Sequence, residues 1–498
     1  MHALLLASAF CVATCGLVYE LLAATLASYV FGDSVTQFST VIGTYLFAMG
    51  IGSWLTRYVS GDLLQRFVRI EILVGLLGGF SALLLFWIFR EAAGFRIGLY
   101  AVVFVIGTLV GAEIPLLLRA LKGTMSLRDS VSRVFAADYI GALLAAVVFP
   151  MVLVPRLGLA RTAFLTGTIN VAVALLLAMR LRRNPGVVAL RLGACAALLV
   201  LCVGFAVADR AQSAIEAGSY PGQVLYLEST PYQRVVLTSV RGDLQLFLNG
   251  NLQFSARDEY RYHEALVHPA MRRAKQSSRV LVLGGGDGLA TREVLRYPQV
   301  ARVDLVDLDR GVTDLFRLTP WLAALNGGSL TSPRVHIQNT DAFSWLQRTH
   351  DSYDVVIADF PDPANFSIGK LYTTAFYRAL GRILRPGGIA VIQATSPFVA
   401  PRSYWCIVST LEAAGLVATP YHALVPSFGD WGFVLASRDP AGNLQPLPPG
   451  LRFLDDRTEA GLFEFPTDVR RVESAPNRLN DQVLVRYFED EWNRYLQD

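Results

Sequence analysis

The sequence contains few charged residues and few cysteines. Asp, Glu, Lys and Arg make up 17% of the 498 residues, hydrophobic residues make up 53%, and the mean hydropathy is +0.41. This composition excludes an ordinary soluble enzyme. The cysteines form no disulfide framework, because four lie in apolar runs and one stands alone. They are Cys11, Cys15, Cys195, Cys202 and Cys406.

Metal-ligand clusters and nucleic-acid-binding patterns are also missing from the sequence. The five Cys and six His residues show no spacing typical of a metal site, so we expect no metal. The basic residues interrupt apolar runs and do not gather with aromatic residues. This pattern argues against a nucleic-acid partner.

Charge and hydropathy divide the chain into two parts. Residues 1–210 contain 16 Lys or Arg and 9 Asp or Glu, whereas the remainder contains 28 and 31. A basic, apolar front part predicts a membrane domain, and the rest predicts a soluble one. Because about 20 apolar residues cross a bilayer as a helix, we expect about seven transmembrane helices. The predicted spans are 3–30, 36–56, 70–89, 97–118, 135–155, 159–179 and 188–208.

Among the ionisable residues inside these spans we single out three acids, namely Glu20, Glu113 and Asp138. Charged groups in a bilayer are costly, so each invites a functional hypothesis. One interpretation is an interhelical hydrogen bond or a position near the headgroups. The other is a path or site for a cation.

After a linker at 211–222, the pattern of the sequence changes to short strands. Alternation over 224–248 and the Asn249-Gly250 turn predict a small β-domain at 223–262. From 279 onward, strands alternate with helices, which predicts a Rossmann-like, methyltransferase-type doubly wound sheet over 263–440. The remaining segment, 441–498, forms a tail with a terminal helix. The expected strands of the sheet are 279–283, 302–306, 334–338, 354–358, 388–394, 421–425 and 432–437.

A glycine-rich turn follows the first strand of the predicted sheet. It runs from Leu283 to Gly288 and contains Gly284, Gly286 and Asp287. Such a turn brings the backbone close to a nucleotide-like ligand. A turn that receives a phosphate or a carboxylate does not ordinarily carry an acid. Asp287 therefore predicts a ligand with a positive charge.

Further acids follow the next strands, at the edge where open α/β sheets bind ligands. Asp307 lies twenty residues after Asp287, the usual spacing for an acid that holds ribose hydroxyls. Asp341 is suited to accept from an adenine amino group. The pair Asp359 and Asp362 predicts a site that holds and deprotonates an amine. Each aspartate alone could instead be a helix N-cap.

The soluble part resembles the spermidine synthase (polyamine aminopropyltransferase) family over about residues 224–437. The apolar front part resembles the membrane-anchored branch of that family. The motifs that carry the resemblance include Glu228-Ser229-Thr230-Pro231-Tyr232-Gln233, Asp258-Glu259-Tyr260-Arg261-Tyr262-His263-Glu264, Gly284-Gly285-Gly286-Asp287-Gly288, Asp341-Ala342 and Asp359-Phe360-Pro361-Asp362-Pro363.

The resemblance implies transfer of an aminopropyl group from decarboxylated S-adenosylmethionine to an amine, putrescine by default. The products would be spermidine and 5′-methylthioadenosine, and no cofactor would be bound permanently. Decarboxylation leaves an ammonium group on the donor, which Asp287 would complement. Asp307 departs from the glutamate usual in the family, which shortens its reach to the ribose.

The resemblance also implies roles for individual residues. Asp359 would be the general base. The nucleoside would contact the glycine turn at Gly284 and Gly286, and the side chains or backbone of Gln233, Asp307, Asp341 and Ala342. The amine would lie against His263, Asp287, Asp362 and Tyr262.

Two other functions stay open from the residues alone. One is an S-adenosylmethionine-dependent methyltransferase, and the other is a polyamine transporter or sensor whose soluble domain binds without turnover. We expect a multi-pass protein of the cell membrane with the lipid bilayer as a partner, and assembly into a homo-oligomer is possible. The donor is a cytoplasmic metabolite, so the catalytic domain is expected in the cytoplasm, although seven spans and the basic loops favour the opposite side.

Overall fold

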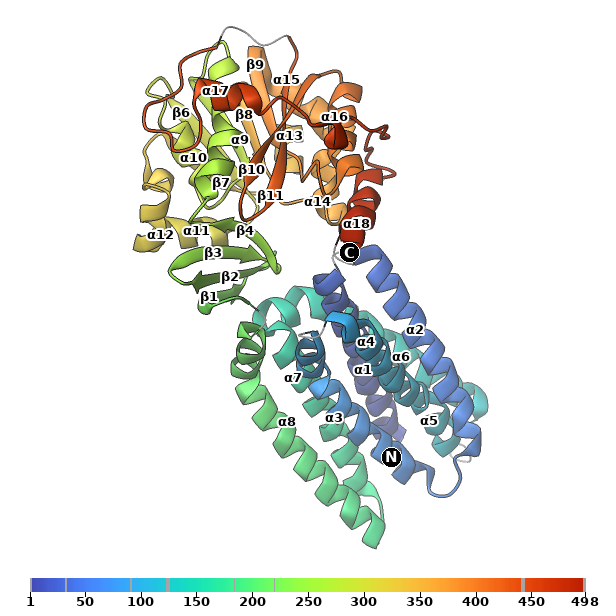
Figure 1. The fold of residues 1–498 in the computed structure, drawn as a ribbon. Helices are drawn as coiled ribbons and strands as arrows, with labels where there is room; N and C mark the ends of the chain where they lie inside the picture. The colour runs from blue at the N-terminus through green and yellow to red at the C-terminus, as the bar shows by residue number, and fades with distance from the viewer. Residues whose placement is uncertain are drawn as a thin grey trace. The chain divides into compact units, whose positions relative to one another are not determined.

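The computed structural model describes residues 2–31, 34–89, 92–121, 126–182, 184–218, 220–439 and 444–495. The chain divides into two compact units, Met1–Pro221 and Gly222–Asp498. The first unit is helical and the second combines two β-sheets with helices (Figure 1).

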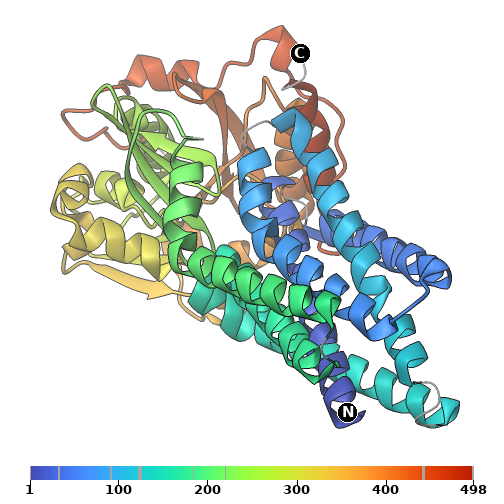
Figure 2. The same ribbon diagram turned by 90° about the horizontal axis from the view of Figure 1, so that it is seen from below.

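The helices of the first unit lie alongside one another as a bundle (Figure 1 and Figure 2). Their apolar length follows directly from the sequence, and six helical elements are long and apolar enough to cross a membrane. The helices and short turns are α1 (His2–Phe31), α2 (Ser34–Leu55), η1 (Thr56–Tyr58), α3 (Leu63–Phe89), α4 (Ala92–Gly111), α5 (Glu113–Leu121), α6 (Leu127–Val148), η2 (Phe149–Leu153), α7 (Val154–Arg180) and α8 (Pro185–Ala217).

The number of long apolar elements in the described residues is six, where the sequence predicts seven spans. The difference arises because the predicted spans 135–155 and 159–179 belong to one 53-residue element, Arg128–Arg180. This element is not straight: the π-helical turn η2 interrupts it, and Gly158 has a φ of 71°. At 1.5 Å per residue, α6 and α7 are each long enough to span a hydrocarbon core of about 30 Å.

The second unit begins with a four-stranded antiparallel meander in the order β1-β2-β3-β4. Its strands are β1 (Gln223–Ser229), β2 (Arg234–Val240), β3 (Asp243–Leu248) and β4 (Asn251–Ser255). Asn249 and Gly250 form the predicted hairpin turn, with φ values of 50° and 84°. Two boundaries differ from the prediction. Helix α8 continues to Ala217, within the expected linker, and α9 (Glu259–Arg273) begins inside the expected β-domain.

The larger sheet has seven strands in the order β10-β11-β9-β8-β5-β6-β7. The five strands from β9 to β7 are parallel, and β11 and β10 extend the sheet as an antiparallel hairpin. The Rossmann-like class is therefore confirmed, as a mixed sheet. The strands are β5 (Arg279–Gly284), β6 (Arg302–Asp307), β7 (Val335–Asn339), β8 (Tyr353–Asp359), β9 (Leu384–Gln393), β10 (Val417–Val425) and β11 (Gly429–Ser437).

This sheet is buried on both faces, as the near-continuous apolar runs of its central strands require. In β5, Val280 and Val282 belong to the core under α9, whereas Leu281 and Leu283 belong to the core on the opposite face. The remaining helices and turns are α10 (Leu289–Val294), α11 (Arg310–Leu318), α12 (Pro320–Leu325), η3 (Ser329–Thr331), α13 (Ala342–Arg348), α14 (Phe366–Gly369), η4 (Lys370–Tyr372), α15 (Thr374–Ile383), α16 (Pro401–Ala413), α17 (Asp456–Gly461), η5 (Thr467–Val469) and α18 (Val483–Tyr495).

The order of the strands locates the ligand edge. From β5 the chain proceeds outward through β6 and β7, then returns to place β8 on the other side of β5. Ligands of open α/β sheets bind outside the carboxyl ends of the strands at such a switch point. The glycine turn after β5 and the acidic loop after β8 both lie there.

Candidate active site

The glycine turn between β5 and α10 has the backbone that its sequence predicts. Gly284 and Gly285 adopt φ values of 78° and 63°, in the left-handed region that favours glycine. Space is also restricted, because a Cβ atom on Gly284 would lie 2.1 Å from the carbonyl oxygen of Asp359. At Gly286, a Cβ atom would lie 2.8 Å from the Asp307 carboxyl group. These glycines let the turn approach the ends of β6 and β8.

Asp359 ends β8 and is the register partner of Gly284 on β5. The Tyr262 hydroxyl, from α9, donates a hydrogen bond of 2.6 Å to Asp359 Oδ1. Burial raises the pKa of the Asp359 carboxyl, while the charge of His263 and the hydrogen bond from Tyr262 oppose the rise. The structure thus brings Gly284, Asp359 and Tyr262, which were predicted and are distant in the sequence, together at the switch between β5 and β8.

Asp287 and Asp362 flank this point. Burial raises the pKa of the Asp287 carboxyl to about 6; His263 opposes the rise and Asp359 reinforces it. Burial also raises the pKa of Asp362, to about 7, against hydrogen bonds from Gln393 and Thr395. The pKa of a buried carboxyl group rises because its charged form loses contact with water, and a nearby positive charge opposes this rise. A cationic ligand would supply that charge, so the site is complementary to an amine.

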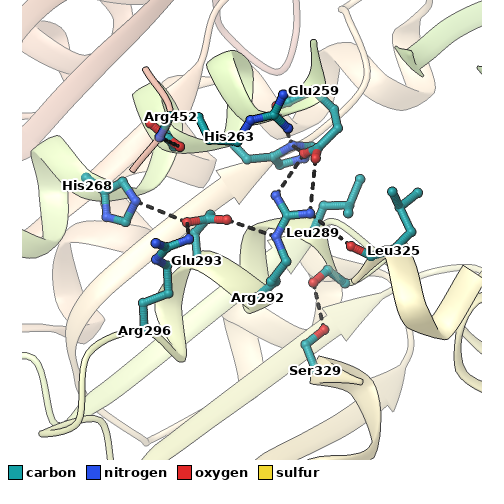
Figure 3. A network of polar contacts seen from close by, with 12 residues as sticks. Glu259, His263, His268, Leu289, Arg292, Glu293, Arg296, Leu325, Ser329 and Arg452 are labelled. Carbon is teal, nitrogen blue, oxygen red and sulfur yellow. Dashed lines mark hydrogen bonds and ion pairs between the residues drawn. The ribbon is translucent and has the colours of Figure 1, made fainter. Parts of the chain in front are cut away.

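His263 is held on α9 by a charged network that the sequence analysis did not identify (Figure 3). Its Nδ1 lies 2.8 Å from Glu259 Oε2 and 2.9 Å from the Glu259 carbonyl oxygen. Both partners are acceptors, so Nδ1 carries the hydrogen, and within the described residues Nε2 has no hydrogen-bond partner. Arg292 donates two hydrogen bonds of 3.0 Å to the Glu259 carboxylate. Burial lowers the pKa of His263, but Glu259 outweighs it and the net pKa is raised.

Asp307 ends β6, and Gln233 contacts Asp309 just beyond the end of this strand. The Gly286 N–H donates to Asp307 Oδ2 over 3.1 Å, which joins the glycine turn to the predicted ribose acid. Burial raises the pKa of Asp307 to about 6. Gln233, in the turn between β1 and β2, donates to Asp309 Oδ2 over 2.9 Å. The small sheet therefore supplies Gln233 next to the position where Asp307 ends its strand.

Asp341 is a helix N-cap, the alternative role considered for it from the sequence. Its Oδ2 accepts from the Ser344 N–H over 3.0 Å at the start of α13. Its Oδ1 pairs with Lys370 Nζ at 2.8 Å. Burial acts to raise the pKa of Asp341, but Lys370 and Ser344 outweigh it and the net pKa is lowered. Ala342 is the buried first residue of α13.

Gln393 positions the acidic loop after β8, a role not predicted from the sequence. Its Nε2 donates to the Phe360 carbonyl over 2.8 Å and to Asp362 Oδ1 over 3.1 Å. Its Oε1 accepts from Trp431 Nε1 over 3.1 Å, which fixes the orientation of the amide. Gln393 is the last residue of β9, so the rule that polar residues at strand ends mark the site could have found it.

The C-terminal segment after β11 contacts two parts of the second unit near the site, α9 and the segment Gly369–Tyr372. The Glu264 carboxylate, on α9, accepts three backbone hydrogen bonds of 2.8–2.9 Å from residues 452–454. Asn477 is fully buried and donates to the carbonyls of Gly369 and Tyr372, over 3.2 and 3.1 Å. The tail therefore fixes both α9 and the segment that follows the acidic loop.

The curated relatives match this chain over nearly its whole length, and the family model matches part of its second unit. Residues 259–446 match the model of the spermine/spermidine synthase domain. Polyamine aminopropyltransferase 2 of Ralstonia nicotianae is 53% identical over 99% of both chains. Polyamine aminopropyltransferase of Leptospira interrogans is 47% identical over 100% of both chains, so the helical unit is shared with these relatives. A crystal structure of spermidine synthase in complex with the transition-state analogue AdoDATO is 24% identical, with a TM-score of 0.47; the match covers 51% of this chain and 91% of that one.

Proposed function

Because the chain belongs to the polyamine aminopropyltransferase family and is an enzyme of that family, we propose that its acceptor is putrescine. The donor is decarboxylated S-adenosylmethionine, and the products are spermidine and 5′-methylthioadenosine. The observation that carries this proposal is the carboxyl cluster of Asp287, Asp359 and Asp362 at the switch point, where burial raises the pKa of each group and a cationic amine would be attracted.

The reaction is a single displacement. The attacking amine first loses a proton, because an ammonium nitrogen has no lone pair, and Asp359 is the base that takes it. The nitrogen then bonds to the methylene carbon next to the sulfonium, and the carbon–sulfur bond breaks with its electrons left on sulfur. The sulfonium becomes a neutral thioether. Alignment of nitrogen, carbon and sulfur supplies much of the rate.

Tyr262 holds the base in place through its bond to Asp359 Oδ1, which leaves Oδ2 to face the amine. Asp287 and Asp362 bind ammonium groups, and His263 lines the same space through its free Nε2. On the nucleoside side, Asp307 accepts from the ribose hydroxyls. Asp341, Ala342, Gln233 and the glycine turn at Gly284 and Gly286 complete this wall in the proposal.

A donor panel tests the reaction. The purified full-length protein is incubated with putrescine and either S-adenosylmethionine or its decarboxylated form, and the products are identified by mass. We expect 5′-methylthioadenosine and spermidine from the decarboxylated donor alone. S-adenosylhomocysteine from the other donor would instead support the methyltransferase alternative. Replacing putrescine with spermidine or longer diamines tests the acceptor separately.

We also propose that the helical unit spans the cell membrane and that the catalytic unit faces the cytoplasm. The support is the six long apolar helices and the cytoplasmic origin of the donor. The basic loops would favour the opposite side if the bent element Arg128–Arg180 crosses twice. A reporter fused after Asp498 tests the orientation, and activity of a periplasmic reporter would contradict it.

A further inference from the structure

The helical unit contains a buried polar cluster that aminopropyl transfer does not use. It joins four elements: Tyr19 on α1, Glu71 on α3, Glu113 at the start of α5 and Asn170 on α7. None of the four is more than 2% exposed. Glu71, which lies in the expected span 70–89, was not singled out from the sequence. Glu113 was singled out, and its partner in the structure is Glu71.

The Glu71 and Glu113 carboxyl groups lie within hydrogen-bonding reach of each other. Asn170 Nδ2 donates to Glu71 Oε2 over 2.8 Å and to the Glu71 carbonyl over 3.1 Å. An ionised carboxylate has no hydrogen to donate, so a carboxyl–carboxyl hydrogen bond requires one proton between the two groups. The contact itself therefore calls for a bound proton.

Within the part of the chain that the structure describes, no Lys, Arg or His forms an ion pair with Glu71 or Glu113. The titratable groups within electrostatic range on the neighbouring helices are all acids, and none can offset a second negative charge. They are Cys15 and Tyr19 on α1, Tyr45 on α2 and Asp138 on α6. Two unpaired buried anions would be very costly.

Several polar atoms of the cluster have no hydrogen-bond partner among the described residues. When the carboxyl groups are counted as ionised, Glu71 Oε1 and Glu113 Oε1 meet no donor. The Tyr19 hydroxyl and Asn170 Oδ1 are also unpaired, although both residues are buried. Buried polar atoms without partners are rare in native proteins and point to an unseen proton or ligand.

The packing around the cluster is too close for a large ligand. A Cβ atom on Gly78 would lie 2.3 Å from the Tyr19 ring, and one on Gly75 would lie 2.5 Å from Val171. Glycines thus let α1, α3 and α7 approach each other closely. Glu113 begins α5 directly after α4 ends at Gly111, at a break in the apolar element Gly94–Leu121. Carboxyl groups at such breaks are typical of ion and proton sites in membrane proteins.

We propose that Glu71 and Glu113 form a proton-binding site, in which the two carboxyl groups share one proton. The helical unit then has a chemical role of its own beyond anchoring the enzyme. This inference does not depend on the acceptor amine or on the identity of the base in the catalytic unit.

Infrared difference spectroscopy on the full-length protein in lipid nanodiscs tests the proposal. At neutral pH we expect a carbonyl band of a protonated carboxyl group that is lost in the double variant Glu71→Gln/Glu113→Gln. Asp209→Asn is the matched control, since it removes an exposed carboxyl group of the same unit that is paired with Arg161, and it should leave the band unchanged. Absence of the band in the wild type, or its full persistence in the double variant, would overturn the proposal.

Two further measurements guard against misfolding and against a different ligand. Each single variant keeps one carboxyl group and gains an amide donor, so each should fold and show a band displaced in frequency by the new partner. An undisplaced band in both would refute a shared proton. A rise in the melting temperature with NaCl or putrescine at constant ionic strength, absent from the double variant, would show that a cation occupies the site instead.

Discussion

Both units contain grouped carboxyl groups, but their surroundings differ. In the catalytic unit, Asp287, Asp359 and Asp362 are partly exposed at the open end of a sheet, next to His263. In the helical unit, Glu71 and Glu113 are at most 2% exposed and have no basic neighbour in the described residues. The first arrangement can take in and release a cationic substrate. The second is buried, and we propose it as a proton site, so exposure to solvent rather than acidity distinguishes the two clusters.

The strongest test of this contrast removes the proposed base. Asp359→Asn should lower kcat about 10²–10⁴-fold, because the amine would have to lose its proton without a positioned acceptor. Formation of 5′-methylthioadenosine by the purified protein measures the effect. Asp351→Asn is the control, since Asp351 is a half-exposed carboxylate of the same unit paired with Arg279. Equal rates for wild type and Asp359→Asn would show that another group accepts the proton.

The next largest effect is expected from the substitution of Asn477 in the C-terminal tail. Asn477→Ala should destabilise the catalytic unit by about 1–3 kcal/mol, because the buried carbonyls of Gly369 and Tyr372 lose their donor. It should also lower kcat/KM, since the segment after the acidic loop is no longer held. Denaturant unfolding and steady-state kinetics measure the two effects. Asn480→Ala alters an exposed asparagine nearby and should change neither. A loss of stability with unchanged kinetics would limit the tail to a structural role.

Putrescine binding should depend on pH in the catalytic unit only. The Asp287 and Asp362 carboxyl groups have pKa values raised to about 6 and about 7, so lowering the pH through this range neutralises the groups that attract the amine. We expect affinity to fall by up to about tenfold for each pH unit below the pKa of a group that must ionise. Calorimetric titration at several pH values measures this dependence.

The same groups predict a pH dependence of stability. Their folded-state pKa values exceed the ordinary value of 3.8, so their contribution to stability is present at low pH and lost as the pH rises through about 6 to 7. Bound putrescine should offset this loss, and its thermal stabilisation should be larger above that range than below it. The Glu71→Gln/Glu113→Gln variant should bind putrescine as the wild type does. Weaker binding would place an amine in the helical unit and break the contrast.

The smallest expected effect lies at the nucleoside wall. Lys370→Met removes the partner of Asp341, and because this pair is about one-third exposed its loss should cost less than about 1 kcal/mol. We expect a modest change in KM for the sulfonium donor with little change in KM for the amine. Lys275→Met, at an exposed site away from the carboxyl cluster, is the matched control. An effect on the amine alone would show that Asp341 does not serve the nucleoside.

Much of the catalytic unit could be predicted from local sequence. Apolar runs of strand length located all seven strands of the sheet, and acids at their carboxyl ends were expected to converge, as Asp287 and Asp359 do. The residues that hold the site were not predicted. Glu259 and Arg292 lie on different helices, Gln393 ends another strand, and Asn477 is in the tail. Nothing in their local pattern says which distant atoms they reach.

The sequence by itself determined the division into two units, the Rossmann-like sheet and the placement of an acid after each of four strands. These follow from hydrophobic period and length, which are local properties of the chain. Tertiary structure alone decided that Glu71 meets Glu113, that Glu259 fixes His263 and that the tail holds Gly369. Periodicity shows that a face is buried, but only packing decides which polar groups face each other across it, and those contacts decide protonation and binding.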